Sequence, residues 1–247
     1  MTHHRQLPLP FRFQPRFDRV DFMSDDSNQA ALAWLDRPAD WPDRRLLLWG
    51  EAGCGKTHLL HAWAAETGGT LLDGPNLRIV PPAALGFVID DADLVPDEAV
   101  LLHLLNAARD EGVPVLLSAR TPPARWTIAL PDLGSRLRAI TAVEIGHPGP
   151  CLLRALLMRL LSERQLRVDE TLQEWLLLRL PRSPGALREA VRRLDRAALA
   201  AGGRITRSLA TAEIEAAEMP DDGTPEAVHQ RMSAAPFFDD AQTRWLL

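Results

Sequence analysis

The sequence predicts an α/β fold in which a parallel sheet, with helices on both faces, is followed by a small all-helical domain. Short apolar segments alternate with helical patterns up to about residue 146, whereas residues 151–218 show helical patterns and almost no strand pattern. Alternation of this kind is typical of parallel strands joined by crossover helices. A glycine-rich turn between the first apolar segment and the helix after it supports the same fold.

The glycine-rich turn joins the apolar segment 46–49 to a helical pattern over residues 58–66. It consists of Gly50, Glu51, Ala52, Gly53, Cys54, Gly55, Lys56 and Thr57. These residues fit the pattern of a phosphate-binding loop, whose N–H groups and helix dipole face an anion. Lys56 is predicted to neutralise the β- and γ-phosphates of ATP or ADP, Thr57 to hold Mg²⁺, and His58 to complete the cofactor site. An ordinary turn with an exposed lysine is the alternative, but every required residue type and both flanking elements are present.

Two acidic residues follow the apolar segment at residues 85–89. Asp90 and Asp91 stand where a buried parallel strand would reach the carboxyl edge of the sheet, and ligands bind at that edge. Asp90 is predicted to hold the metal through its water shell, and Asp91 to polarise the attacking water. An isolated acidic pair is more often a helix cap or a solvated turn, but the phosphate loop upstream reverses that preference.

The remaining elements of the α/β region follow from periodicity and punctuation. Residues 1–20, rich in Pro, Phe and Arg, predict an extended arm, and residues 28–35 predict a helix with Ser27 available as its cap. A strand is expected near residues 70–72. Residues 97–111 predict an amphipathic helix with Leu101, Leu102, Leu104 and Leu105 facing inward. Buried strands are expected at residues 113–118 and 142–145.

The pattern changes after the His-Pro-Gly-Pro segment at residues 147–150. Helices are expected at residues 151–164, 169–180, 184–201 and 206–218. The predicted organisation is therefore an N-terminal arm (1–16), an α/β domain (17–147), a helical domain (148–218) and a flexible tail (219–247).

Composition restricts the functional classes. A net charge of −5 gives no overall attraction for nucleic acid. The two cysteines, Cys54 and Cys151, do not suggest a disulfide framework. No segment approaches the roughly 18 consecutive apolar residues of a membrane span, and no signal peptide is recognisable. These features predict a cytoplasmic protein.

Two further segments carry a family resemblance. The segment Leu-Leu-Ser-Ala-Arg-Thr-Pro-Pro (116–123) and the segment Leu-Pro-Asp-Leu-Gly-Ser-Arg-Leu (130–137), with the phosphate loop and a helical lid, resemble the AAA+ ATPase core of the replication initiator DnaA. The resemblance covers roughly residues 17–215 and implies a P-loop AAA+ fold. It also implies that Ser118 is a polar sensor of the γ-phosphate and that Arg136 is an arginine finger. The alternative for Arg136 is a surface arginine that caps a helix or pairs with Asp132.

The chain also differs from the initiator. Only about 30 residues follow the last expected helix, too few for a helix-turn-helix domain, and residues 73–86 leave little room for the initiator's helices that engage single-stranded DNA. The chain therefore resembles the Hda family of DnaA-related regulators. Gln6, Leu7, Leu9 and Phe11 resemble the peptide by which that family binds the sliding clamp, the β subunit of DNA polymerase III. The alternative is an arm that packs on its own domain.

The resemblance implies a regulatory function. Hda-like proteins, bound to nucleotide and held by the clamp, promote hydrolysis of DnaA-bound ATP and so negatively regulate initiation of DNA replication. Arg136 would act in trans on that ATP, and an arginine finger is worth about 10³ to 10⁵ in rate. The partners expected are DnaA and the clamp, with little direct DNA binding, and homo-oligomers are left open.

One position departs from the DnaA-like pattern. Alignment on residues 194–196 places Gly185 where the lid of that family carries a sensor arginine, so weak intrinsic ATPase activity is expected. Arg182 or Arg188 can substitute only from a neighbouring turn. Other readings are a AAA+ loader or remodeller, a DnaA-related scaffold that does not stimulate hydrolysis and, more distantly, a small-molecule kinase. His58 and His61 are expected to pack rather than to bind a metal.

Overall fold

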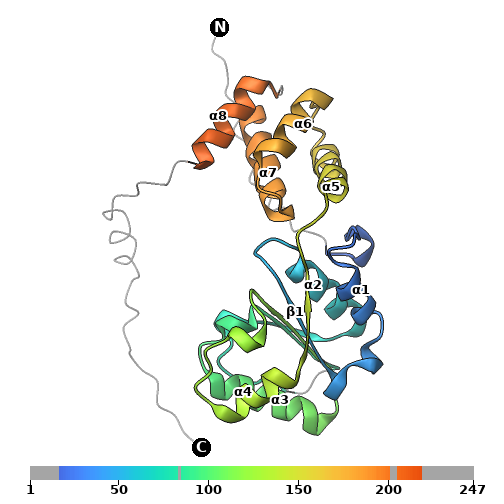
Figure 1. Cartoon of the computed structure of the whole chain (residues 1–247), viewed down its shortest axis with the longest axis vertical. Coiled ribbons are helices and arrows are strands. Elements are labelled where there is room, and N and C mark those ends of the chain that lie inside the picture. Colours follow the sequence, from blue (N-terminus) through green and yellow to red (C-terminus); the bar gives the residue numbers. More distant parts are fainter. Residues whose placement is uncertain (1–16, 83–84, 201–204, 219–247) are drawn as a thin grey trace, which may run out of the picture.

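The computed structural model describes residues 17–82, 85–200 and 205–218. It confirms the predicted fold, a parallel sheet with helices on both faces followed by a helical domain at one end of the sheet (Figure 1). The clamp-binding prediction for Gln6, Leu7, Leu9 and Phe11, like the tail at residues 219–247, lies outside the described residues.

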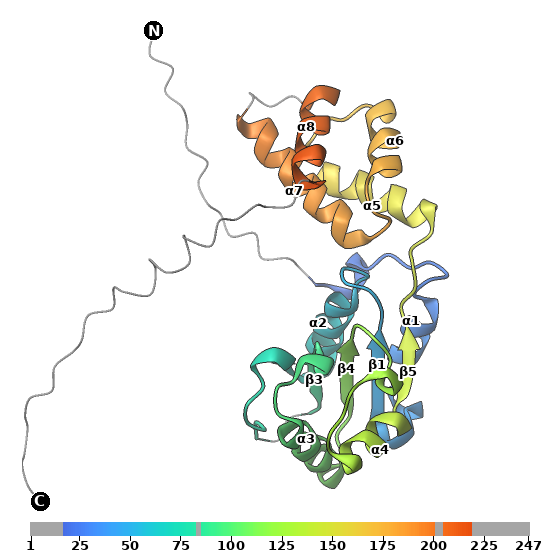
Figure 2. The ribbon, with the colours of Figure 1, turned by 60° about the vertical axis from the view of Figure 1, so that its left-hand side comes forward.

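The sheet has five parallel strands in the order β2-β3-β4-β1-β5, and Figure 2 labels β3, β4, β1 and β5 in this order. The strands are β1 (Arg45–Trp49), β2 (Thr70–Asp73), β3 (Phe87–Asp90), β4 (Val115–Ala119) and β5 (Thr141–Glu144). Since β1 lies between β4 and β5, with β3 next to β4, the carboxyl ends of β1, β3 and β4 meet at one edge. That edge carries the residues predicted to bind nucleotide.

Helices complete both domains. Those of the α/β domain are α1 (Gln29–Leu35), α2 (Lys56–Thr67), α3 (Glu98–Glu111) and α4 (Pro131–Ala139). The helical domain, here called the lid, contains α5 (Pro150–Glu163), α6 (Glu170–Arg179), α7 (Pro184–Ala200) and α8 (Arg207–Glu218). None of the helices in the described part of the chain is long and apolar enough to cross a membrane.

The core of the α/β domain lies on both faces of the sheet. Leu46 and Leu48 pack with α1 and α2, whereas Leu47 packs on the opposite face with α3 and α4. All three side chains are fully buried, which explains why β1 is continuously apolar instead of alternating. A separate cluster of leucines fills the lid, so each domain has its own core.

Local details correct two expectations. Ser27 does not cap α1: Asn28 occupies the cap position without a side-chain cap bond, and the Ser27 hydroxyl donates to Asp25 instead. Leu102 is only partly buried, while the other three leucines expected to face inward are buried. The short polar side chains before α1 form a local turn, and this competes with capping.

We expect Leu116→Ala to destabilise the α/β domain by about 2 to 5 kcal/mol, because it leaves a cavity in the middle of β4, where Leu116 is fully buried. Urea unfolding followed by tryptophan fluorescence measures the change. Leu178→Ala is the control, since that side chain is 81% exposed, and its effect should stay within about 0.5 kcal/mol. Equal effects of the two substitutions would contradict this core assignment.

Candidate nucleotide-binding site

The glycine-rich turn forms a loop between β1 and α2, as predicted. Gly50, Gly53 and Gly55 have φ angles of 156°, 79° and 116°, a region that other residues rarely adopt. The loop leads directly into α2, which begins at Lys56. The free N–H groups of the first helical turn therefore lie beside the loop, where an anion is favoured.

Lys56 is buried against the inside of this loop. Its Nζ donates to the carbonyl oxygens of Gly50 and Glu51, at 2.8 and 3.0 Å. The side chain also lines a cavity of about 800 Å³ between the two domains. The predicted phosphate-binding lysine thus stands at the wall of a cavity large enough for a nucleotide.

Hydroxyl groups from two neighbouring elements hold Asp90. Thr57 Oγ1 donates to Asp90 Oδ2 at 2.8 Å, and Ser118 Oγ donates to Asp90 Oδ1. Ser118 Oγ also accepts the backbone N–H of Asp91 at 2.9 Å. The structure therefore brings together three residues predicted to bind metal or sense phosphate, and their hard oxygen atoms suit Mg²⁺.

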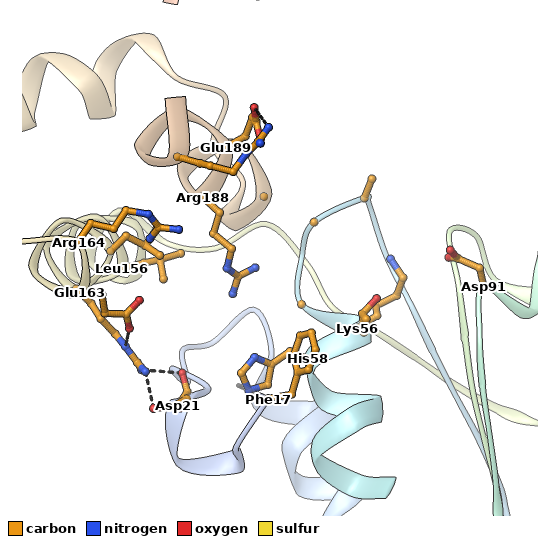
Figure 3. Close-up of a pocket in the computed structure, with 18 of the residues that line it drawn as sticks. Phe17, Asp21, Lys56, His58, Asp91, Leu156, Glu163, Arg164, Arg188 and Glu189 are labelled. Atoms are coloured by element: carbon orange, nitrogen blue, oxygen red, sulfur yellow. Dashed lines mark hydrogen bonds and ion pairs between the residues drawn. The ribbon is translucent and has the colours of Figure 1, made fainter. Parts of the chain in front are cut away.

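Asp91 lies in the turn after β3 and lines the cavity on the same side as Lys56 (Figure 3). Burial raises the pKa of its carboxyl group, and the negative charges of Asp90 and Asp93 raise that pKa further. Lys56 and Arg120 oppose this increase. A carboxylate whose pKa is raised is a better proton acceptor, which fits the role predicted for Asp91.

The chain segment before α1 forms a second wall of the cavity. Phe17 lies edge-on to His58, with ring centroids 5.5 Å apart, and stacks on His61 at 4.3 Å. Nε2 of His58 is 2.9 Å from the carbonyl oxygen of Asp18, and burial lowers the pKa of the ring. Both histidines therefore pack against Phe17. His58 also lines the cavity, as the cofactor prediction requires.

The lid supplies the third wall, chiefly through α5 and α7. Leu156, Leu160 and Arg159 line the cavity from α5. Arg159 bonds the backbone oxygen of Asp21 at 2.8 Å, the Asp21 carboxylate, and Glu163 at 2.8 Å. This ion-pair cluster ties the lid to the segment before α1. Sequence reasoning missed these residues because no motif marks a contact between positions so far apart.

Gly185, at the position expected for a sensor arginine, rests directly on the phosphate loop. Its N–H donates to the carbonyl oxygen of Gly53 at 3.1 Å. A Cβ added at Gly185 would lie 2.9 Å from Gly53 Cα, and one added at Gly53 would lie 2.8 Å from Gly185 Cα. Two backbones can approach this closely only without side chains, so the structure gives a physical reason for glycine here.

Arg136, the predicted arginine finger, does not line this cavity. It lies on α4, where its Nε is 3.1 Å from Asp132 Oδ1, and its side chain is 21% exposed. The pairing with Asp132 considered from the sequence is therefore present. Figures 1 and 2 show α4, which carries Arg136, at the end of the α/β domain that lies away from the lid.

The sheet, the loop, the acidic strand end and the lid together define a P-loop protein with the AAA+ fold. Residues 13–90 match the family model described as the bacterial DnaA ATPase domain, and this part of the chain is similar to that domain. An uncharacterised protein of Haemophilus influenzae is 25% identical over 223 residues, which cover 82% of this chain and 95% of that protein. The chromosomal replication initiator DnaA of Mesorhizobium japonicum is 27% identical over 179 residues, covering 59% of this chain but only 36% of the initiator.

Solved structures agree with the fold. Domain III of DnaA from Thermotoga maritima superposes with a TM-score of 0.71 at 16% identity, over 82% of this chain and 97% of that domain. A DnaA structure bound to AMPPCP and single-stranded DNA gives a TM-score of 0.65 at 15% identity, over 83% of this chain and 70% of that one. At 15% and 16% identity, the likeness of these structures to the chain shows the fold alone.

We expect Gly185→Ala to separate the lid from the phosphate loop, because the new methyl group would meet backbone rather than a movable side chain. Overpacking of this kind costs about 1 to 3 kcal/mol. Hydrogen exchange of the amides at the start of α7 should accelerate accordingly. The control is Gly146→Ala, whose Cβ would make only ordinary contacts at 3.8 Å or more. Unchanged exchange in the Gly185 variant would show that this contact does not hold the lid.

Proposed function

We propose that this protein is a nucleotide-bound, DnaA-related regulator of the Hda type. It binds the sliding clamp through its N-terminal arm and promotes hydrolysis of ATP bound to DnaA, thereby limiting initiation of replication. The observation that carries the proposal is the position of Arg136 outside the chain's own cavity. Arg136 belongs to the segment that resembles the arginine-finger segment of DnaA, yet it does not line this chain's own cavity. It is therefore available to contact the nucleotide of a neighbouring protein.

The resident ligand in this proposal is ATP or ADP with Mg²⁺. Lys56 and the loop amides bind the phosphates, while Thr57 and Asp90 hold the metal, which neutralises charge on the phosphates when it is bound. The support is the cluster of loop, hydroxyl and carboxylate groups around one cavity. Adenine nucleotide is the choice because a DnaA structure of the same fold contains AMPPCP.

The surroundings of Arg136 suit a role in trans. Its partner Asp132 is 57% exposed, and an exposed i,i+4 ion pair contributes only about 0.3 to 0.5 kcal/mol. Phosphate oxygens can therefore replace the Asp132 carboxylate at small cost. Burial lowers the pKa of the neighbouring Arg45, Asp43 opposes this change, and the charge of Arg136 adds to it.

Clamp binding adds local concentration rather than chemistry. Gln6 supplies a hydrogen-bonding amide, and Leu7, Leu9 and Phe11 supply apolar area on an arm that proline residues stiffen. Tethering to the clamp raises the effective concentration of Arg136 near clamp-associated DnaA. Since Gly185 brings no cation to the chain's own nucleotide, its own ATPase activity is expected to be weak.

A reconstituted hydrolysis assay tests the proposal with ATP-loaded DnaA from the same organism and clamp loaded on DNA. Wild type should accelerate hydrolysis, and Arg136→Ala should abolish the acceleration because the γ-phosphate loses its trans guanidinium. The double substitution Gln6→Ala, Leu9→Ala should also abolish it, because the clamp no longer recruits the protein. Arg138→Ala is the matched control, because Arg138 is an exposed arginine of the same helix, and it should retain the activity.

Two results would contradict the proposal. Rapid ATP hydrolysis by this protein alone, with no effect on DnaA, would point to an independent AAA+ motor. If the Arg136→Ala variant stimulated hydrolysis of DnaA-bound ATP as fully as wild type, the protein would act on DnaA without an arginine finger.

A further inference from the structure

The carboxylate of Glu98 binds two backbone N–H groups immediately before α4. Glu98 is the first residue of α3, and its side chain is partly buried. Its Oε1 accepts a hydrogen bond from the N–H of Ala129 at 2.9 Å, and its Oε2 accepts one from the N–H of Leu130 at 2.7 Å. Hydrogen bonds to a charged carboxylate are about twice as strong as those between neutral groups. Both oxygen atoms of Glu98 therefore hold the chain where it enters α4.

This interaction takes the place of a side-chain cap on α4. Leu130 occupies the N-cap position and makes no side-chain cap bond, and Pro131 is the first helical residue. The negative charge of Glu98 also lies beside the N-terminal end of α4, where the helix dipole favours it. The beginning of α4 is thus attached to α3 through the side chain of Glu98.

Apolar packing alone defines the position of α4 less sharply. Leu133 and Leu137 of α4 are buried in the same core cluster as leucines of α3. Apolar contacts have no preferred direction, whereas the hydrogen bonds of Glu98 require particular distances and angles. Arg136 lies in the last turn of this helix of nine residues. At about 1.5 Å per residue, it is about 9 Å along the axis from Leu130, so a change in tilt at Glu98 moves it.

A second carboxylate holds the other end of the segment between β4 and α4. Asp93 Oδ2 accepts a hydrogen bond from the backbone N–H of Arg120 at 3.0 Å, directly after β4. Asp93 and Glu98 both belong to the segment that leads from the acidic strand end into α3. The β4–α4 segment is therefore attached at both of its ends to residues that follow Asp91.

We infer that Glu98 is a positioning residue for Arg136. By fixing the N-terminal end of α4 relative to α3, it sets where the guanidinium group of Arg136 is presented to the nucleotide of a partner protein. Glu98 does not line the cavity of this chain, so it acts through α4. The inference rests on the proposed function of Arg136, and it deepens that proposal by naming the side chain that holds the arginine in place.

The reconstituted assay with ATP-loaded DnaA and clamp on DNA tests the inference on the full chain. Glu98→Gln replaces one acceptor oxygen by an NH₂ group, which cannot accept a backbone N–H, so α4 should shift. The maximal rate of stimulated hydrolysis should fall about 10- to 100-fold, because a small misplacement of a catalytic group is costly. The protein concentration for half-maximal stimulation should change less than about twofold, because no binding group is removed.

Glu111→Gln is the matched control. Glu111 is an exposed glutamate at the other end of α3, and its variant should keep the wild-type rate. Glu98→Asp keeps the charge on a shorter side chain, and its rate should lie between those of the wild type and Glu98→Gln.

Two further measurements on Glu98→Gln distinguish positioning from a general loss of structure. Hydrogen exchange of the Ala129 and Leu130 amides should accelerate, because their shared acceptor is impaired. The affinity for Mg·ADP should match that of the Glu111→Gln variant, because Glu98 lies outside the cavity.

The possible results separate the two proposals. A lower maximal rate together with faster exchange at Ala129 and Leu130 supports the positioning role. A wild-type maximal rate in both Glu98 variants would overturn it, and so would a loss that comes entirely from weaker half-saturation or weaker binding of Mg·ADP. Failure of the wild type to stimulate DnaA would instead overturn the proposed function, and with it the role of Glu98 in that function.

Discussion

The contact between the backbones of Gly53 and Gly185 is the constraint on which the arrangement of the site depends. It joins the phosphate loop to the first turn of the lid helix α7, and a Cβ on either residue would lie under 3 Å from the other backbone. The Arg159–Asp21 ion pair fixes the lid at a second point. These two points of attachment, on α7 and on α5, join the lid to the α/β domain beside the cavity.

The parallel sheet supplies the other half of the site. Its strand order brings the ends of β1, β3 and β4 together, and this places Thr57, Asp90 and Ser118 within one hydrogen-bonded group. Ser118 is fully buried, and its hydroxyl contacts both the Asp90 carboxylate and the Asp91 backbone. The Ser118 hydroxyl therefore links Asp90 and Asp91 to β4. Such a link is the property expected of a polar sensor.

The sequence was sufficient to predict the elements that carry a local signal. The phosphate loop, the acidic strand end and the change to an all-helical domain each depend on neighbouring residues, and the structure confirms the fold that they predict. Contacts between distant segments had no such signal. Phe17 meets His58 only when the segment before α1 packs on α2, and Arg159 meets Asp21 only when the lid packs on that same segment. The sequence showed that Gly185 stands where an arginine was expected. The steric reason became apparent only from the structure, in which the backbone of Gly53 lies against Gly185.

The central claim is that both domains contribute to one nucleotide site. Hydrogen exchange of the full chain, measured with and without Mg·ADP, tests it most directly. The account predicts slower exchange both in the loop at residues 50–57 and in the first turns of α7, because nucleotide would bridge the two domains. Slower exchange in the loop alone would show that the lid takes no part in binding, and unchanged exchange throughout would contradict the nucleotide site.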